Sequence, residues 1–331
     1  MEEHFHPKIT TRQELEELIN NTNCIKYSKL PKIPKRIIAI GDIHGDFGHL
    51  FFILNRLNLI DHNNNWIGGN TIIVQTGDVL DDGGRGYDTN KKEYSADEIA
   101  IYNLLINLNI EANKKGGAVL MCIGNHEIVN ILDSNIDHVN IYTKKYYSDV
   151  LKTNRKNIIS LGSEMATKLS CVLKSIIKIG DIYFCHGGIS KQLYNNVVLR
   201  KKWNSFDSFI DHINSVLPKI LKGNVELYSE ELEFIKNISL NRDFGMFMPN
   251  EFVCDDIDIM FGPEGKLVIG HTVQPQGINS ICNNRIFRID TAISRAFGSN
   301  INKLEVLEII DCKHFYRISI LPNEIIKTKL T

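Results

Sequence analysis

The chain has 331 residues, a formal net charge of -1 and 43% hydrophobic residues, which is the composition of a globular protein with a substantial core. The near-zero charge argues against a global nucleic-acid or membrane surface, and no apolar run reaches the roughly 18 residues of a membrane span. The polar N-terminus lacks the pattern of a secretory signal. We therefore expect a soluble, intracellular (cytoplasmic) protein without nucleic-acid or membrane partners.

The predicted elements follow an N-terminal appendage over residues 1–35. Thr10 or Thr11 is expected to cap a short helix through Ile19, and a linker with lysines and prolines follows. Apolar runs then alternate with helical periodicity, with strands expected at 36–41, 71–77 and 117–124 and helices at 47–57 and 96–110. This alternation is typical of βαβ units and a parallel sheet.

The second half of the chain is richer in short β-type runs. Three such runs, KLSCVL, SIIKIG and DIYFCHG, span 168–187, with a tight turn expected at Gly180-Asp181. Residues 195–241 read as helical and polar, and four more strands are expected within 267–321. We predict an α/β fold of two packed sheets, one mostly parallel and one mixed, flanked by helices. The catalytic domain would span 36–331, with helical insertions near the site at about 130–165 and 195–240.

The seven cysteines are scattered without CxxC pairs. Four lie in or near apolar runs: Cys122, Cys171, Cys185 and Cys282. This placement and the odd count favour reduced core residues of an intracellular protein over a disulfide framework.

Five short polar segments each follow an apolar, strand-like run. They are GDIHGD (41–46), GDVLDDGG (77–84), GNHE (124–127), HGG (186–188) and GHT (270–272). Any one alone is more often a turn or a packed histidine than a functional site. Five such segments in series indicate a functional site, because ligands bind at the carboxyl ends of strands in α/β sheets. Together they present Asp42, His44, Asp78, Asn125, His126, His186 and His271.

These side chains combine oxygen ligands with imidazole and include no cysteine. Such a set suits manganese, which we favour, or iron or zinc, and it is too large for one tetrahedral site. We therefore predict two adjacent divalent metals that share one carboxylate. Two metals roughly 3.5–4 Å apart can activate a bridging water and clamp a phosphoryl oxygen.

The ordered motifs resemble those of the calcineurin-like metallophosphoesterase superfamily, whose pattern is GDxHG, GDxxDRG, GNHE, HGG and GHT. Glu127 in GNHE points to the phosphoprotein phosphatase branch. The stretches GNHEIVNIL, LGSEMATKLSCVLKSIIKIGDIYFCHGGIS and VIGHTVQPQGINSICNNRIFRIDTAISRAFG resemble segments of the bacterial-type, Shewanella-like phosphatases. The resemblance covers about residues 36–310.

The resemblance implies a role for each matching residue. The first metal would be bound by Asp42, His44 and Asp78, and the second by Asp78, Asn125, His186 and His271. Asp78 would then be the bridge, because a carboxylate can use both oxygens. His126 would be the general acid, oriented by Asp81. The implied reaction is hydrolysis of a phosphomonoester, on a protein or a small molecule, by a metal-bridging hydroxide. Any regulatory partner is left unidentified by the sequence.

One motif departs from the family pattern. GDVLDDGG places Asp82 where the family has an Arg that grips the substrate phosphate. A carboxylate facing a phosphate dianion would repel it, so we expect Asp82 to point elsewhere and Arg85 to supply the guanidinium. Arg242, in SLNRDFG, resembles the second phosphate-binding Arg of the family, a residue suited to bidentate contacts.

Two further residues remain open between a role in the site and a role in the fold. Arg295 either lines the site entrance or ties its loop down. Asp46 either supports a metal ligand or caps the helix that begins at Phe47. His49 is expected to pack on that helix.

Two other functions remain possible from the sequence. The altered GDVLDDGG loop permits a dinucleoside polyphosphate hydrolase or phosphodiesterase, since such enzymes share the motifs. A catalytically weak binding protein with a phosphatase fold is disfavoured, because every metal position and the His126–Asp81 pair are present.

Overall fold

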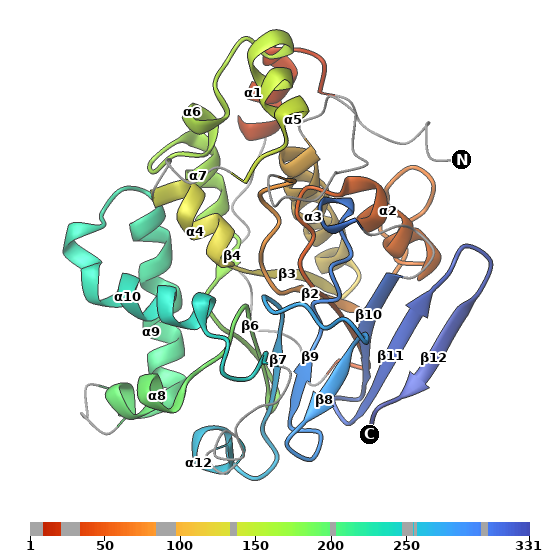
Figure 1. Cartoon of the computed structure of the whole chain (residues 1–331), viewed down its shortest axis with the longest axis vertical. Helices are drawn as coiled ribbons and strands as arrows, with labels where there is room; N and C mark the ends of the chain where they lie inside the picture. The colour runs from red at the N-terminus through yellow and green to blue at the C-terminus, as the bar shows by residue number, and fades with distance from the viewer. Residues whose placement is uncertain are drawn as a thin grey trace.

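Two mixed β-sheets pack face to face and carry helices on their outer sides (Figure 1). This computed structural model describes residues 9–20, 34–83, 97–132, 138–198, 203–246, 254, 257–298 and 304–331. The predicted α/β architecture of two packed mixed sheets is confirmed.

The first sheet has seven strands in the order β12-β11-β10-β1-β2-β3-β4. Its parallel half contains the predicted βαβ strands β1 (Arg36–Ile40), β2 (Ile72–Gln75) and β3 (Ala118–Cys122), followed by β4 (Leu173–Lys174). Its antiparallel half contains β10 (Leu304–Ile310), β11 (His314–Ile320) and β12 (Ile325–Lys329). The halves join where β10 pairs antiparallel with β1.

The second sheet has five strands in the order β5-β6-β7-β9-β8. Its three central strands are parallel: β6 (Ile182–Cys185), β7 (Lys266–Ile269) and β9 (Ile286–Arg288). Its edge strands are antiparallel: β5 (Ile177–Ile179) and β8 (Asn279–Ile281). The expected turn at Gly180-Asp181 joins β5 to β6.

The core between the sheets explains why the parallel strands are apolar on both faces. Val74 and Leu120 of the first sheet and Phe184 and Val268 of the second belong to one buried cluster. The outer faces pack against helices, so these strands meet almost no water. The buried core holds the carboxyl ends of the strands in a fixed arrangement.

Two helices cross over between the parallel strands of the first sheet, as predicted. They are α2 (Phe47–Arg56) and α3 (Asp97–Lys114). Asp46 is the N-cap of α2, because its Oδ1 accepts a hydrogen bond from the His49 amide at 3.1 Å. The capping alternative for Asp46 is therefore correct.

Most remaining helices lie on the flank that Figure 1 shows in yellow-green to cyan. They are α4 (Asn125–Leu132), α5 (Ile141–Lys145), α6 (Arg155–Ile159), α7 (Glu164–Leu169), α8 (Lys191–Val198), α9 (Phe206–Leu221) and α10 (Ser229–Leu240), while α12 (Ile257–Phe261) lies below them. A π-helical turn, Tyr146–Val150, follows α5. The helix α9 is amphipathic, and its apolar face is buried. That these helices are insertions stays a prediction.

The N-terminal helix α1 (Arg12–Asn20) packs against α7. Leu15 and Ile19 are buried. Thr11 caps the helix, since its Oγ accepts a hydrogen bond from the Glu14 amide at 3.1 Å and Glu14 Oε2 accepts one from the Thr11 amide at 3.0 Å. The predicted cap is confirmed at Thr11, while the predicted linker falls mostly outside the described residues.

Two sequence expectations about strands are wrong. In KLSCVL (168–173) only Leu173 lies in a strand, at the start of β4, because Lys168 and Leu169 complete α7, which Ser163 caps. The strands β8 and β12 were not expected. β8 has three residues, and β12 is a largely exposed edge strand, so neither shows a strong apolar pattern.

The cysteines also differ from expectation. Cys254 and Cys282 form a disulfide, and Cys171 is disulfide-bonded as well. Spacing alone could not identify such pairing. Cys122, Cys185 and Cys312 are free. The intracellular location rested partly on reduced cysteines and stays a prediction. Among the described helices, none is both long and apolar enough to cross a membrane.

Candidate active site

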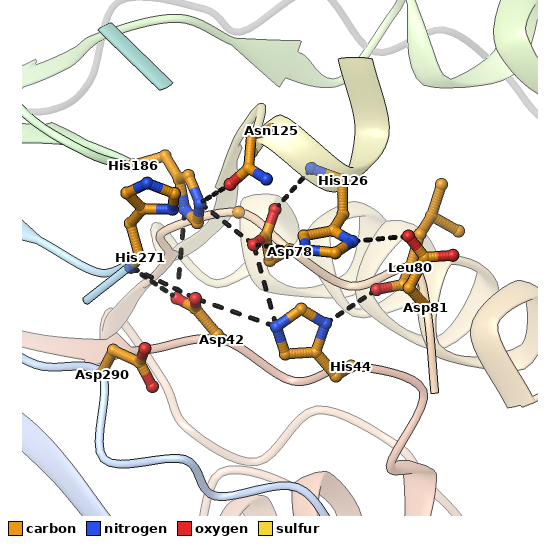
Figure 2. Close-up of polar contacts among 12 residues, drawn as sticks. Asp42, His44, Asp78, Leu80, Asp81, Asn125, His126, His186, His271 and Asp290 are labelled. Carbon is orange, nitrogen blue, oxygen red and sulfur yellow. Dashed lines mark hydrogen bonds and ion pairs between the residues drawn. The ribbon is translucent and has the colours of Figure 1, made fainter. Parts of the chain in front are cut away.

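The polar segments after β1, β2, β3, β6 and β7 converge on one point, as Figure 2 shows. Their side chains surround Asp78 and line a cavity of about 220 Å³. The described lining residues are Asp42, His44, Asp78, His126, Arg242, His271, Val273, Asp290 and Phe297. Asn125 and His186 lie beside them and bond each other, with Oδ1 and Nε2 2.9 Å apart.

Several of these side chains depend on an unusual backbone. His44, Asp78, Asp81 and His271 have φ values of 42°, 58°, 71° and 65°. Non-glycine residues seldom adopt this left-handed region, and each costs on the order of 1–3 kcal/mol. The rest of the fold must therefore hold them there.

Buried Glu127 provides much of that support. Its carboxylate accepts hydrogen bonds from the amides of Asp78 at 2.8 Å, Val79 at 2.9 Å and Gly124 at 2.8 Å. One side chain of α4 thus fixes the loops after β2 and β3 together. Gly124 must be glycine, because a Cβ there would lie 2.1 Å from Asp78 Oδ1.

The histidines are oriented as metal ligands are. His44 Nδ1 lies 2.9 Å from the Leu80 carbonyl and His186 Nδ1 lies 2.9 Å from the Thr76 carbonyl. Contacts of this kind place a ring proton on Nδ1, which leaves Nε2 as the nitrogen that faces the site and could ligate a cation. His271 Nε2 is buried without a hydrogen-bond partner. A bound cation would explain why this buried nitrogen, in a site that also contains carboxylates, has no hydrogen-bond partner.

The ligand atoms form two groups that share one residue. Those of His44, Asp78 and His126 lie within 4.8 Å of one another, as do those of Asp78, His186 and His271. Asp42 lies close to the first group, with Oδ2 4.0 Å from His44 Nε2. The residues present therefore fit two adjacent divalent cations with Asp78 between them.

The pKa shifts that the protein groups cause in one another also indicate a cation site. Burial and the neighbouring Asp290 raise the pKa of Asp42 well above its usual range. Burial lowers the pKa of His186, but Asp78 and Asp42 outweigh it and raise the value to about 10. The buried carboxylates thus demand a positive charge beside them. Burial lowers the pKa of His271 to about 3, so this imidazole stays neutral and able to ligate.

His126 is held by the carboxylate of Asp81. Asp81 Oδ2 lies 2.5 Å from His126 Nδ1. Asp81 also accepts from Asn130 Nδ2 at 2.7 Å and from Arg155 Nη2 at 3.3 Å. His126 Nε2 remains on the side of the metal groups, 3.9 Å from Asp78 Oδ2.

The sequence analysis missed part of the site. Arg155 pairs with buried Glu98 through two contacts of 2.7 Å, and with Asn130 Oδ1 at 2.6 Å. Glu98 and Arg155 come from two separate helices, α3 and α6, and follow no motif, so no local signal marks them. Asn130, in contrast, lies in GNHEIVNIL, four residues after His126. Asp290, in contrast, follows β9 in RIFRID, and the same strand-end rule would have identified it.

The three arginines that the sequence analysis singled out do not all fall in the site. Arg242 lines the cavity and donates from Nη1 to the His271 carbonyl at 3.1 Å. Arg85 lies outside the described residues. Arg295 ties its loop to Asp46, with Nη2 2.9 Å from Oδ1. Burial raises the pKa of Asp46, but His49 and Arg295 outweigh this and lower it to about 2.

Asp82 is buried and turned away from the metal groups, as expected. Its Oδ1 accepts from the Asn140 amide at 2.9 Å and its Oδ2 from the Thr143 hydroxyl at 2.5 Å. The residue that replaces the family Arg therefore anchors the segment leading into α5.

A family model described as calcineurin-like phosphoesterase matches residues 35–275. The chain therefore belongs to the calcineurin-like phosphoesterase family, and the predicted resemblance is confirmed. It is 32% identical over 276 residues to Shewanella-like protein phosphatase 1 of Plasmodium berghei, covering 78% of this chain and 67% of that protein. It is 25% identical over 324 residues to Shewanella-like protein phosphatase 2 of Arabidopsis thaliana, covering 83% and 75%.

Solved structures show the same fold. The crystal structure of a cold-active protein-tyrosine phosphatase of a psychrophilic Shewanella species aligns with a TM-score of 0.69 at 21% identity. The alignment covers 92% of this chain and 85% of that one.

Proposed function

We propose that this chain is a metal-dependent phosphoprotein phosphatase that hydrolyses phosphomonoesters. The observation that carries the proposal is that Asp78 belongs to both groups of ligand atoms, beside a His126–Asp81 pair. The relatives named protein phosphatases support a protein substrate.

The metal ligands are proposed as the sequence assigned them. Asp42, His44 and Asp78 would hold one cation, and Asp78, Asn125, His186 and His271 the other. Manganese is favoured, and iron or zinc suits the same donors. Two such cations, when bound, lower the pKa of the attacking water and neutralise the phosphoryl oxygens.

The remaining steps belong to the protein side chains. His126 would donate a proton from Nε2 to the leaving oxygen of serine, threonine or tyrosine, while Asp81 holds Nδ1. Arg242 would grip the phosphate from the cavity wall. Arg85 is proposed as a second contact from its place in the loop sequence alone.

A peptide panel tests this function. The protein is loaded with manganese, and phosphate release is measured from matched phosphoserine, phosphothreonine and phosphotyrosine peptides, with Asp78→Asn as the blank. We expect peptide turnover that the substitution abolishes, because it disrupts the shared ligand. Diadenosine tetraphosphate runs in parallel. Cleavage of the dinucleotide without any peptide turnover would replace our proposal with a nucleotide hydrolase.

A further inference from the structure

A second, larger cavity of about 670 Å³ lies beside the metal centre, against α4, the segment leading into α5, and α6. Its described lining contains no carboxylate and five cationic side chains: Lys144, Lys145, Lys152, Arg155 and Lys156. Asp149 belongs to the same segment but is not among the described lining residues, and it accepts a hydrogen bond from Ser148.

These cations divide into a fixed floor and an accessible rim. Arg155 is buried and engaged with Glu98, Asn130 and Asp81. Lys145, Lys152 and Lys156 are exposed, and within the described part of the chain they have no ion-pair partner. A ligand that offers negative charge would therefore meet unpaired ammonium groups above a buried guanidinium.

The backbone at Lys152 adds a second observation. Its φ is 51°, in the left-handed region that glycine and asparagine adopt at lower cost than lysine. Lys152 is exposed and holds this costly backbone conformation in the lining of the cavity. Strain of this kind is found preferentially at binding sites.

The cavity adjoins the residues that surround and hold His126. His126, the proposed proton donor to the leaving oxygen, has its ring 5.5 Å from that of His138, and the next residue, Val139, lines the cavity. Asn130 also lines it and bonds Asp81. The peptide part of a substrate must leave on the side of the proton donor, and an extended peptide advances about 3.3 Å per residue. A substrate bound in this way would extend its flanking residues toward the cavity.

We propose that this cavity binds acidic side chains, carboxylates or a second phosphate, that flank the phosphorylated residue of a protein substrate. It would thereby determine which phosphoproteins the enzyme prefers. The inference rests on the proposed phosphoprotein phosphatase function and adds the substrate class to it.

The test compares three phosphopeptides with one core and flanks of glutamate, glutamine or lysine. For the wild-type protein we expect kcat/KM to be about three- to tenfold higher with glutamate than with glutamine, since two exposed ion pairs give effects of this size. The preference should vanish near 1 M salt, where the Debye length is about 3 Å. The Lys145→Gln/Lys152→Asn double variant should lose the preference and keep its kcat/KM for p-nitrophenyl phosphate. Asparagine suits the left-handed backbone, so this variant should remain folded.

A matched control removes the same charge elsewhere. Lys114 and Lys115 are exposed at the end of α3, where the chain enters the amino end of β3, and Lys114→Gln/Lys115→Gln should retain the preference. Fluorescence anisotropy with a labelled, non-phosphorylated glutamate peptide gives a readout independent of turnover, and binding should weaken only in the cavity variant. Equal hydrolysis of all three peptides would overturn this inference alone. Hydrolysis of p-nitrophenyl phosphate but of no peptide would overturn the proposed function and this inference together.

Discussion

His126 stands at the end of a chain of buried polar contacts. Asp81 holds the imidazole, Asn130 and Arg155 hold Asp81, and Glu98 neutralises Arg155. Asp81, Glu98 and Arg155 are buried, and low exposure to solvent strengthens polar contacts of this kind. The arrangement keeps Nε2 of His126 on the side of Asp78, while Nδ1 is held by Asp81.

The first prediction concerns this chain of contacts. Arg155→Met alone would leave the Glu98 charge buried and unpaired, a loss of about 3–5 kcal/mol, so the double variant Arg155→Met/Glu98→Gln is preferred. We expect it to fold and to lose kcat more than KM, because Asp81 is less firmly held. The loss should be larger for phenyl phosphate than for p-nitrophenyl phosphate, since the poorer leaving group needs the proton of His126 more.

Asp81→Asn is the control for that prediction, because it removes the direct partner of His126 and should show the same leaving-group pattern. An equal loss of kcat on both substrates in the double variant would reduce Arg155 to a structural role.

Among single site residues, the sequence identifies those that follow strands. Asp42, Asp78 and His271 each follow a glycine within three residues of a strand end, so their convergence follows from the parallel topology. Glu98 and Arg155 lie on different helices and are 57 residues apart in sequence, and only the folded chain brings them together.

At the scale of elements, the loop after β2 and the segment before α5 form one unit. Asp82 accepts from Asn140 and Thr143, and the Gly83 amide donates to the His138 carbonyl at 2.9 Å. A Cβ at Gly83 would approach Asn140 Cα to 3.1 Å. The Asp at position 82 thus connects the catalytic loop to the wall of the lysine-lined cavity.

The second prediction follows from this connection. Asp82→Ala leaves two buried donors unsatisfied and should lower the free energy of unfolding by about 1–3 kcal/mol, measured by urea denaturation. Asp149→Ala, an exposed change in the same region, should alter it by less than about 0.5 kcal/mol. An Asp82→Arg variant that bound p-nitrophenyl phosphate with a lower KM would contradict the account, since it would place position 82 at the phosphate.

Most elements were predictable because their patterns are local. The strand β1 is a continuous apolar run, and α2 has helical periodicity with an Asp cap. The run KLSCVL misled because its apolar residues are shared between the end of α7 and a two-residue strand. The disulfide of Cys254 and Cys282 depends on tertiary contact, which spacing does not encode.

For the whole molecule, the two-sheet core determines where chemistry can occur. Parallel strands of both sheets end at the same rim, so β1, β2 and β3 and then β6 and β7 deliver their polar residues to one place. The resulting cluster of buried carboxylates is unfavourable without cations. The fold and the metal requirement are therefore two consequences of one topology.

The most direct test of this account is the number of metal ions bound per chain. Manganese-loaded protein, freed of loosely bound metal, is analysed by inductively coupled plasma mass spectrometry beside Asp78→Asn and the exposed control Asp149→Asn. We predict two ions per chain in the wild type and the control, and no more than one in Asp78→Asn, because Asp78 belongs to both ligand groups. A single ion in the wild-type protein, or two in Asp78→Asn, would contradict the shared-carboxylate centre.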